Sequence, residues 1–123
     1  MLFSMLLAVL GFMIGLTAKN NKAFKDMLGV MNSAYVVMTK DGKRGRRYII
    51  RNGKYSSDTV LKDYDLALVF ENADIGFKTL ALGGVTGLQV ALNNYELRLA
   101  GNQQLFNSFG ILIAISMGMI KRK

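Results

Sequence analysis

The feature that most constrains the fold is an uncharged segment from Leu2 to Ala18, LFSMLLAVLGFMIGLTA. A helix built from it is apolar around its whole circumference, so no polar face remains for water. Its length lies at the short limit of the roughly 17 to 25 residues that cross a bilayer. Gly11 and Gly15 form a GxxxG pair that lets another helix approach closely. The small residues on this side are Ser4, Ala8, Gly11, Gly15 and Ala18. Three interpretations stay open: a buried helix, a helix that contacts or enters a membrane, and a dimer contact.

A second apolar helix is predicted from Asn102 to Ile120, followed by the charged end Lys121-Arg122-Lys123. A surface helix with one buried face shows polar residues on the other face. Beyond Gln104 this segment offers only Asn107, Ser108 and Ser116. Its second face must therefore meet a ligand, a membrane or the first helix. We expect its small stripe to pack against that of the first helix, within the chain or in a homodimer. This stripe consists of Gly110, Ala114 and Gly118.

The charges around the two apolar helices argue against a pair of membrane spans. Lys and Arg that flank membrane spans concentrate on the cytoplasmic side. Lys19, Lys22 and Lys25 would therefore keep the central region in the cytoplasm, and a second span would then place the basic residues 121–123 on the wrong side. We therefore predict an apolar N-terminal helix over 1–19, either an anchor or part of the core, and one α+β domain over 20–123. The expected location is cytoplasmic and membrane-associated.

The central region changes from helical to strand periodicity and back again. Asn20 and Asn21 can cap an amphipathic helix over 22–31. Alternating, β-branched and aromatic residues then predict strands, and the Asp41-Gly42 and Asn52-Gly53 pairs predict hairpin turns. Both faces of the fourth strand are apolar, so we expect it in the centre of the sheet or covered on both sides. The predicted strands are Ala34–Thr39, Arg47–Arg51, a third from Lys54, Tyr64–Phe70 and Tyr95–Leu99, with helices over Ile75–Leu82 and Val85–Asn93.

Composition excludes most catalytic chemistry. The chain has 51% hydrophobic residues and a net charge of +8, which suggests an apolar surface or cavity that is attracted to an anionic partner. It has no Cys and no His, so thiolates, the commonest general base and the commonest zinc ligand are missing. The Gly-rich run 83–87 lacks the Lys of a phosphate-binding loop. We expect no catalytic residue, no metal and no cofactor.

Basic residues concentrate around the first predicted hairpin. Each Lys or Arg close to an anionic membrane adds about 1 kcal/mol of attraction. We predict a membrane-facing surface made by Lys43, Arg44, Arg46 and Arg47, with a solvated turn as the alternative. We do not expect nucleic-acid binding, because the long apolar helices would have no role in it. The seven basic residues are Lys40, Lys43, Arg44, Arg46, Arg47, Arg51 and Lys54.

From Ser33 to Lys123 the order of elements resembles the sterol carrier protein-2 family. Asp65–Phe70 with the following Phe77–Leu80 is similar to the family's strand-then-helix segment. Ala91 with Leu97–Asn102 is similar to its helix, turn, strand and glycine, after which an apolar C-terminal helix follows. Tyr95 stands where the family usually has Gly, Asn102 where Asp is common, and residues 1–18 have no usual counterpart.

The resemblance implies a five-stranded, mostly antiparallel sheet with helices over one face and an apolar tunnel between them. Such domains are carriers of acyl chains, sterols or isoprenoids, and each buried CH₂ contributes about 0.8 kcal/mol. We predict non-catalytic lipid binding or transfer. The alternative is a membrane-associated structural adaptor that recruits a protein partner. The predicted lining, for which plain core packing is the other interpretation, is Phe77, Leu80, Leu88, Leu105, Phe106, Phe109, Leu112 and Ile113.

Overall fold

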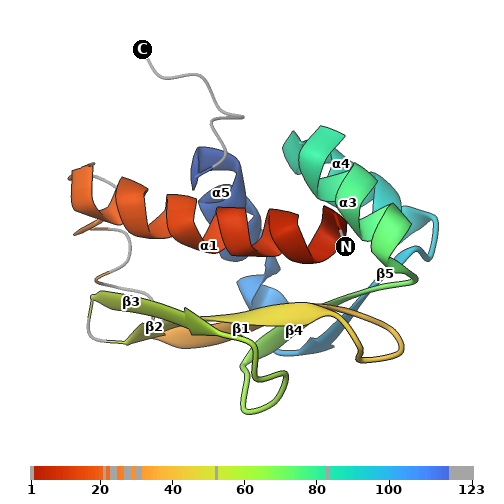
Figure 1. The fold of residues 1–123 in the computed structure, drawn as a ribbon, viewed down its shortest axis with the longest axis horizontal. Coiled ribbons are helices and arrows are strands. Elements are labelled where there is room, and N and C mark those ends of the chain that lie inside the picture. The colour runs from red at the N-terminus through yellow and green to blue at the C-terminus, as the bar shows by residue number, and fades with distance from the viewer. Residues whose placement is uncertain are drawn as a thin grey trace.

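The computed structural model describes residues 2–20, 22, 25–26, 29, 32–51, 53–82 and 84–116. It is the predicted α+β arrangement, in which helices cover one face of a five-stranded sheet (Figure 1). The strands are β1 Ser33–Thr39, β2 Gly45–Arg51, β3 Lys54–Asp58, β4 Leu66–Phe70 and β5 Leu97–Gly101. The helices are α1 Leu2–Asn20, α3 Ala73–Leu82, α4 Gly84–Asn93 and α5 Phe106–Ser116, with a 3₁₀ turn, η1, at Gln103–Leu105.

The sheet has the order β3-β2-β1-β4-β5. The hairpins β1–β2 and β2–β3 form the predicted antiparallel meander, and β5 pairs antiparallel with β4. β4 pairs with β1 in parallel. β4 therefore has a neighbour on each side, and its Leu66, Ala67 and Leu68 are fully buried, as the apolar character of both faces predicted.

Strand alternation separates the two faces of the sheet. Alternate residues such as Tyr35, Tyr48 and Leu68 point toward the helices and join the main hydrophobic cluster. The opposite face is approached by the connection between β3 and β4, which hangs below the sheet in Figure 1. Its Lys62 carbonyl accepts a hydrogen bond of 2.9 Å from Arg47 of β2. The core thus lies between the sheet and the helices.

The first apolar segment is a helix of that core. One face of α1 is buried, with 1% or less of each of Phe3, Leu7, Leu10 and Ile14 exposed. Tyr48 Oη donates a hydrogen bond of 2.8 Å to the Leu7 carbonyl, and Tyr55 Oη donates one of 2.9 Å to the Gly11 carbonyl. In the part of the chain that the structure describes, no helix has both the length and the apolar character needed to cross a membrane.

Within the chain, the predicted pairing of small stripes between the terminal helices is wrong where it can be examined, and a homodimer through these helices stays a prediction. α1 and α5 lie side by side. A Cβ added at Gly11, however, would lie 3.2 Å from Tyr55 Oη, and one at Gly110 would lie 3.7 Å from Leu88 Cδ1. Gly11 therefore makes room for the sheet and Gly110 faces α4. The Ala114 side chain and Gly118 lie outside what is described.

Several predicted boundaries moved or lie outside the described residues. The last helix begins at Phe106, after a 3₁₀ turn in which the Asn102 side chain accepts a hydrogen bond from the Gln104 N–H. Tyr95 has φ of 62°, in the left-handed region that favours glycine, which is why glycine suits this turn. Most of the predicted helix 22–31, together with Asn52, Gly83 and residues 117–123, lies outside the described ranges.

Candidate functional site

The eight residues predicted to line a lipid site lie in one hydrophobic cluster. They come from α3, α4, η1 and α5, which are brought together over the sheet. Five are nearly or fully buried, and Phe77, Leu105 and Phe106 are half-buried at the edge of the cluster. This burial fits both a lining and plain packing, so their contact with a ligand stays a prediction. The five buried residues are Leu80, Leu88, Phe109, Leu112 and Ile113.

The prediction missed the aromatic residues of the sheet beneath α5. The Phe109 ring stacks on the Tyr35 ring, with centroids 4.4 Å apart and planes 2° from parallel. Tyr48 lies beside the same ring at 6.0 Å. Tyr35 and Tyr48 are opposite each other in the β1–β2 register, so they project from neighbouring strands on one face. Strand alternation was the signal that could have found them.

The Tyr35 hydroxyl is exceptional. Within the described ranges, Tyr35 Oη is the one buried side-chain nitrogen or oxygen atom without a hydrogen-bond partner. Burial raises the pKa of Tyr35, the Ser33 hydroxyl lowers this pKa in part, and the Asp65 carboxylate raises it further. Although Ser33 is close enough to act on the pKa, its geometry does not meet that of a hydrogen bond. The hydroxyl therefore stays protonated and carries an unused donor.

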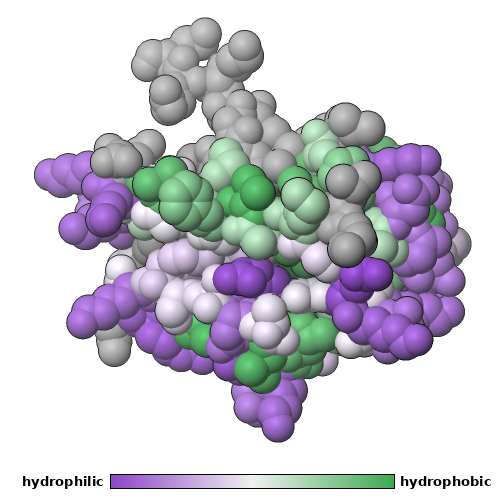
Figure 2. Space-filling view, in the orientation of Figure 1, coloured by the Kyte–Doolittle hydropathy of each residue, from purple (hydrophilic) through white to green (hydrophobic). Residues whose placement is uncertain are grey.

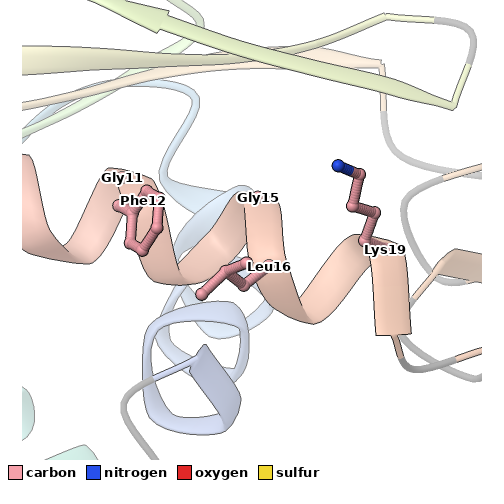
Figure 3. Close-up of a pocket in the computed structure, with 5 residues that line it drawn as sticks. All are labelled: Gly11, Phe12, Gly15, Leu16 and Lys19. Atoms are coloured by element: carbon pink, nitrogen blue, oxygen red, sulfur yellow. The ribbon is translucent and has the colours of Figure 1, made fainter.

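An open groove of about 370 Å³ runs along α1 and is lined by Gly11, Phe12, Gly15, Leu16 and Lys19 (Figure 3). This volume is at the lower end of the roughly 300 to 1,000 Å³ typical of ligand pockets. A Cβ added at Gly15 would lie 3.7 Å from the Tyr55 ring. Gly15 therefore faces β3, which is an edge strand of the sheet.

The side of α1 turned away from the sheet is also apolar. Met5, Val9, Phe12 and Leu16 follow one another at helical spacing and are 43 to 68% exposed. We call these four residues the outer stripe. Figure 2 shows hydrophobic surface over α1 on the face turned toward the viewer. The outer stripe shares Phe12 and Leu16 with the groove, so the groove continues into an exposed apolar surface.

The four residues predicted to face a membrane do not share one surface, because two lie in a turn and two point to opposite faces of β2. Lys43 and Arg44 are exposed in the β1–β2 turn. Arg46 points to the helix side, where its Nε donates a hydrogen bond of 3.1 Å to Ser57 Oγ. Arg47 points to the opposite face and makes two hydrogen bonds, of 3.0 and 2.8 Å, to Asp58. The structure thus leaves only the two turn residues together and fully exposed, and their membrane contact stays a prediction.

The acidic residues support turns and strands. Hydrogen bonds from Thr39 and Lys43 lower the pKa of Asp41, and those from Arg47 lower the pKa of Asp58. Asp65 accepts a hydrogen bond of 2.8 Å from the Ala34 N–H.

Among the residues described, no group of three His, Cys, Asp or Glu side chains could hold a metal ion.

Comparison with known proteins identifies the fold. No protein-family model and no curated protein matches this sequence. A solved structure titled UbiJ-SCP2 ubiquinone synthesis protein superposes with a TM-score of 0.66 over 93% of each chain, at 14% identity. The chain has a sterol carrier protein-2-like fold. Sterol carrier protein 2-like 2 from Aedes aegypti also matches, at 12% identity over 79% of this chain and 96% of the other. Its TM-score is 0.42, and we draw nothing from it.

Proposed function

We propose that this chain is a non-catalytic domain that binds or transfers an apolar lipid, acyl, sterol-like or isoprenoid, between its sheet and its helices. The observation that carries the proposal is the groove along α1, because it is apolar and lies beside Tyr55 of β3, which packs against the hydrophobic cluster. The sterol carrier protein-2-like fold supports the proposal by the resemblance of its architecture.

The lipid would be held by burial of its chain rather than by a polar motif. Each CH₂ removed from water contributes about 0.8 kcal/mol, so a long chain binds without specific contacts. Phe12 and Leu16 form the outer wall of the groove. The half-buried Phe77, Leu105 and Phe106 pack against the edge of the cluster, where they would contact the guest. The buried members of the predicted lining would form the inner wall.

The outer stripe supports membrane association as part of the same function. Exposed apolar side chains in a row, with cations at one end, suit the interface of an anionic bilayer. Lys19 at the end of the groove and the exposed Lys22 and Lys25 supply these cations. Docking this surface on a cytoplasmic, anionic membrane would bring the groove to the lipid. Lys43 and Arg44 remain candidates for a second contact.

The second candidate function is a membrane-associated adaptor, in which the outer stripe or the turn engages a protein partner. The exposure of Phe12, 68%, favours this alternative because such an apolar side chain also suits a protein interface. The two functions differ in one measurable respect. A carrier removes lipid from a vesicle, whereas an adaptor binds the vesicle and leaves the lipid in place.

The test mixes the full chain with vesicles of phosphatidylcholine and phosphatidylglycerol that contain a small fraction of isoprenoid alcohol. The protein is then separated from the vesicles, and its organic extract is analysed by mass spectrometry. The proposal expects lipid in the extract in a near one-to-one ratio with protein. Folded protein that leaves the vesicles without lipid would overturn it, and binding without extraction would favour the adaptor.

A matched pair of variants tests the groove. Leu16→Trp adds bulk to the groove, and Val90→Trp introduces the same residue at a similarly exposed position on α4, outside the groove. We expect Leu16→Trp to extract several-fold less lipid than wild type and Val90→Trp to match wild type. Equal extraction by the two variants would rule out the groove as the entrance.

A further inference from the structure

We infer that the Tyr35 hydroxyl binds the polar head of the lipid, and that this head is an uncharged group with a hydrogen-bond-accepting oxygen, such as an alcohol, ketone, quinone or ester. The inference rests on the proposed function and narrows its ligand class. It starts from three tyrosines that project from adjacent strands on the helix side of the sheet: Tyr35, Tyr48 and Tyr55.

Two of these tyrosines hold α1 in place, and the third does not. Tyr48 donates to the Leu7 carbonyl and Tyr55 to the Gly11 carbonyl, one turn further along α1. Tyr35 lies on the next strand and is 0% exposed, yet its hydroxyl has no partner. A buried polar group without a hydrogen bond is costly and rare in folded proteins. Phe at this position would avoid that cost, so the hydroxyl is a buried donor that a ligand can use.

The surroundings of the hydroxyl define the chemistry of that partner. The Tyr35 ring stacks on the parallel Phe109 ring, with the two centroids 4.4 Å apart. A ligand would therefore contact Tyr35 through its hydroxyl. Burial and the nearby Asp65 carboxylate both keep the phenol protonated, so it is a donor. Burial also disfavours an anionic head group, because a buried charge loses its hydration. The group that fits the Tyr35 hydroxyl is therefore an uncharged oxygen that accepts a hydrogen bond.

The hydroxyl lies near the end of the sheet at which β1 begins. Ser33 precedes Tyr35 by two residues on the same face of β1 and acts on the pKa of its hydroxyl. Ser33 is the first residue of β1 and is 8% exposed. A head group at Tyr35 would thus lie near the end of the strand, while its apolar chain would lie against the buried face of α5, which carries Phe109, Leu112 and Ile113.

The binding test uses displacement of the neutral dye Nile red by dodecane, dodecanol and dodecanoate, with wild type and Tyr35→Phe. These competitors share one apolar chain length and differ in the head group. We expect Tyr35→Phe to lose about two- to tenfold in affinity for dodecanol, the range of one hydrogen bond. Its affinity for dodecane should change less than twofold, and dodecanoate should bind wild type more weakly than dodecanol.

Thermal unfolding of the ligand-free protein gives an independent test. Tyr35→Phe removes an unmatched buried hydroxyl, so its Tm should rise by about 4 °C or more. Tyr48→Phe is the matched control: it removes a hydroxyl that has a partner, so its Tm should fall. An unchanged or lower Tm for Tyr35→Phe, or unchanged affinity of this variant for dodecanol, overturns the inference. Failure of wild type to bind Nile red and every competitor would instead reject the proposed lipid function itself.

Discussion

The inner and outer faces of α1 have the same kind of side chain and opposite environments. Phe3, Leu7, Leu10 and Ile14 are at most 1% exposed, whereas the outer stripe is 43 to 68% exposed. Nothing in their hydropathy distinguishes the two sets. The difference comes from the sheet, because the hydroxyls of Tyr48 and Tyr55 bind the α1 backbone and turn one face inward. The sequence of an apolar helix therefore predicts that the helix is buried on one side, but it does not predict which side.

The largest expected effect is on the inner face. Leu10→Ala should lower the free energy of unfolding by about 2 to 5 kcal/mol, because it leaves a cavity in a closed layer. Phe12→Ala, on the outer stripe, should change it by about 0.5 kcal/mol or less. Chemical denaturation monitored by circular dichroism gives both values. Similar losses of unfolding free energy for the two variants would mean that both faces of α1 are buried, and the difference between its inner and outer face would not hold.

Packing at the start of α1 tests how closely the inner face fits. A Cβ added at Gly76 of α3 would lie 2.6 Å from Phe3 Cε1, so the ring must move. We expect Gly76→Ala to destabilise the protein by about 1 to 3 kcal/mol.

The matched control for that contact is Gly110→Ala in α5, where the nearest atom would be Leu88 Cδ1 at 3.7 Å. This variant should be neutral or gain about 0.5 to 1 kcal/mol, since alanine is the better helix former. Thermal unfolding of the two variants provides the comparison. If both behave alike, α1 does not pack against α3 as closely as the contact at Gly76 requires.

The outer stripe should matter for membranes and not for stability. The double variant Phe12→Ser and Leu16→Ser should bind anionic vesicles about tenfold more weakly, because two apolar side chains no longer enter the interface. Its Tm should remain within a few degrees of the wild-type value. Co-sedimentation with vesicles over a range of salt concentrations measures the binding. Unchanged binding would assign membrane contact to the basic turn instead.

Acid should act on the side of the sheet turned away from α1, where Asp58 pairs with Arg47. Arg47 holds the pKa of Asp58 below its ordinary value of 3.8. The pair therefore adds stability above this value and loses it as the pH falls through the lowered pKa. The Asp58 side chain is 39% exposed, so we expect a small effect. Asp58→Asn should flatten the fall in Tm below pH 4, and an identical fall in the variant would contradict this assignment.

The local elements of this protein could be predicted because their signals are local. Leu66, Leu68 and Phe70 alternate with Ala67 and Val69, and the structure has a strand there with a neighbour on each side. The Asp41-Gly42 pair lies in the β1–β2 turn, with Gly42 at φ of 73°. The eight predicted lining residues gather in one cluster because each lies on an apolar helix segment that must find cover.

The relations between elements could not be predicted in the same way. The expected match of small stripes failed because Gly11 and Gly15 make room for Tyr55, a residue on the far strand of a sheet. Arg46 and Arg47 are neighbours in a strand and so point to opposite faces, but only the register of β2 decides which of them faces the helices. The parallel pairing of β4 with β1 likewise depends on the whole connection between them.

Periodicity and composition thus established an α+β chain with apolar helices and an apolar layer, because each of those signals is contained within a few neighbouring residues. Tertiary structure decided which face of α1 is covered, where the groove opens and which buried tyrosine is left without a partner. Those outcomes depend on contacts such as Tyr48 with Leu7, which are 41 residues apart and exist only once the sheet has formed.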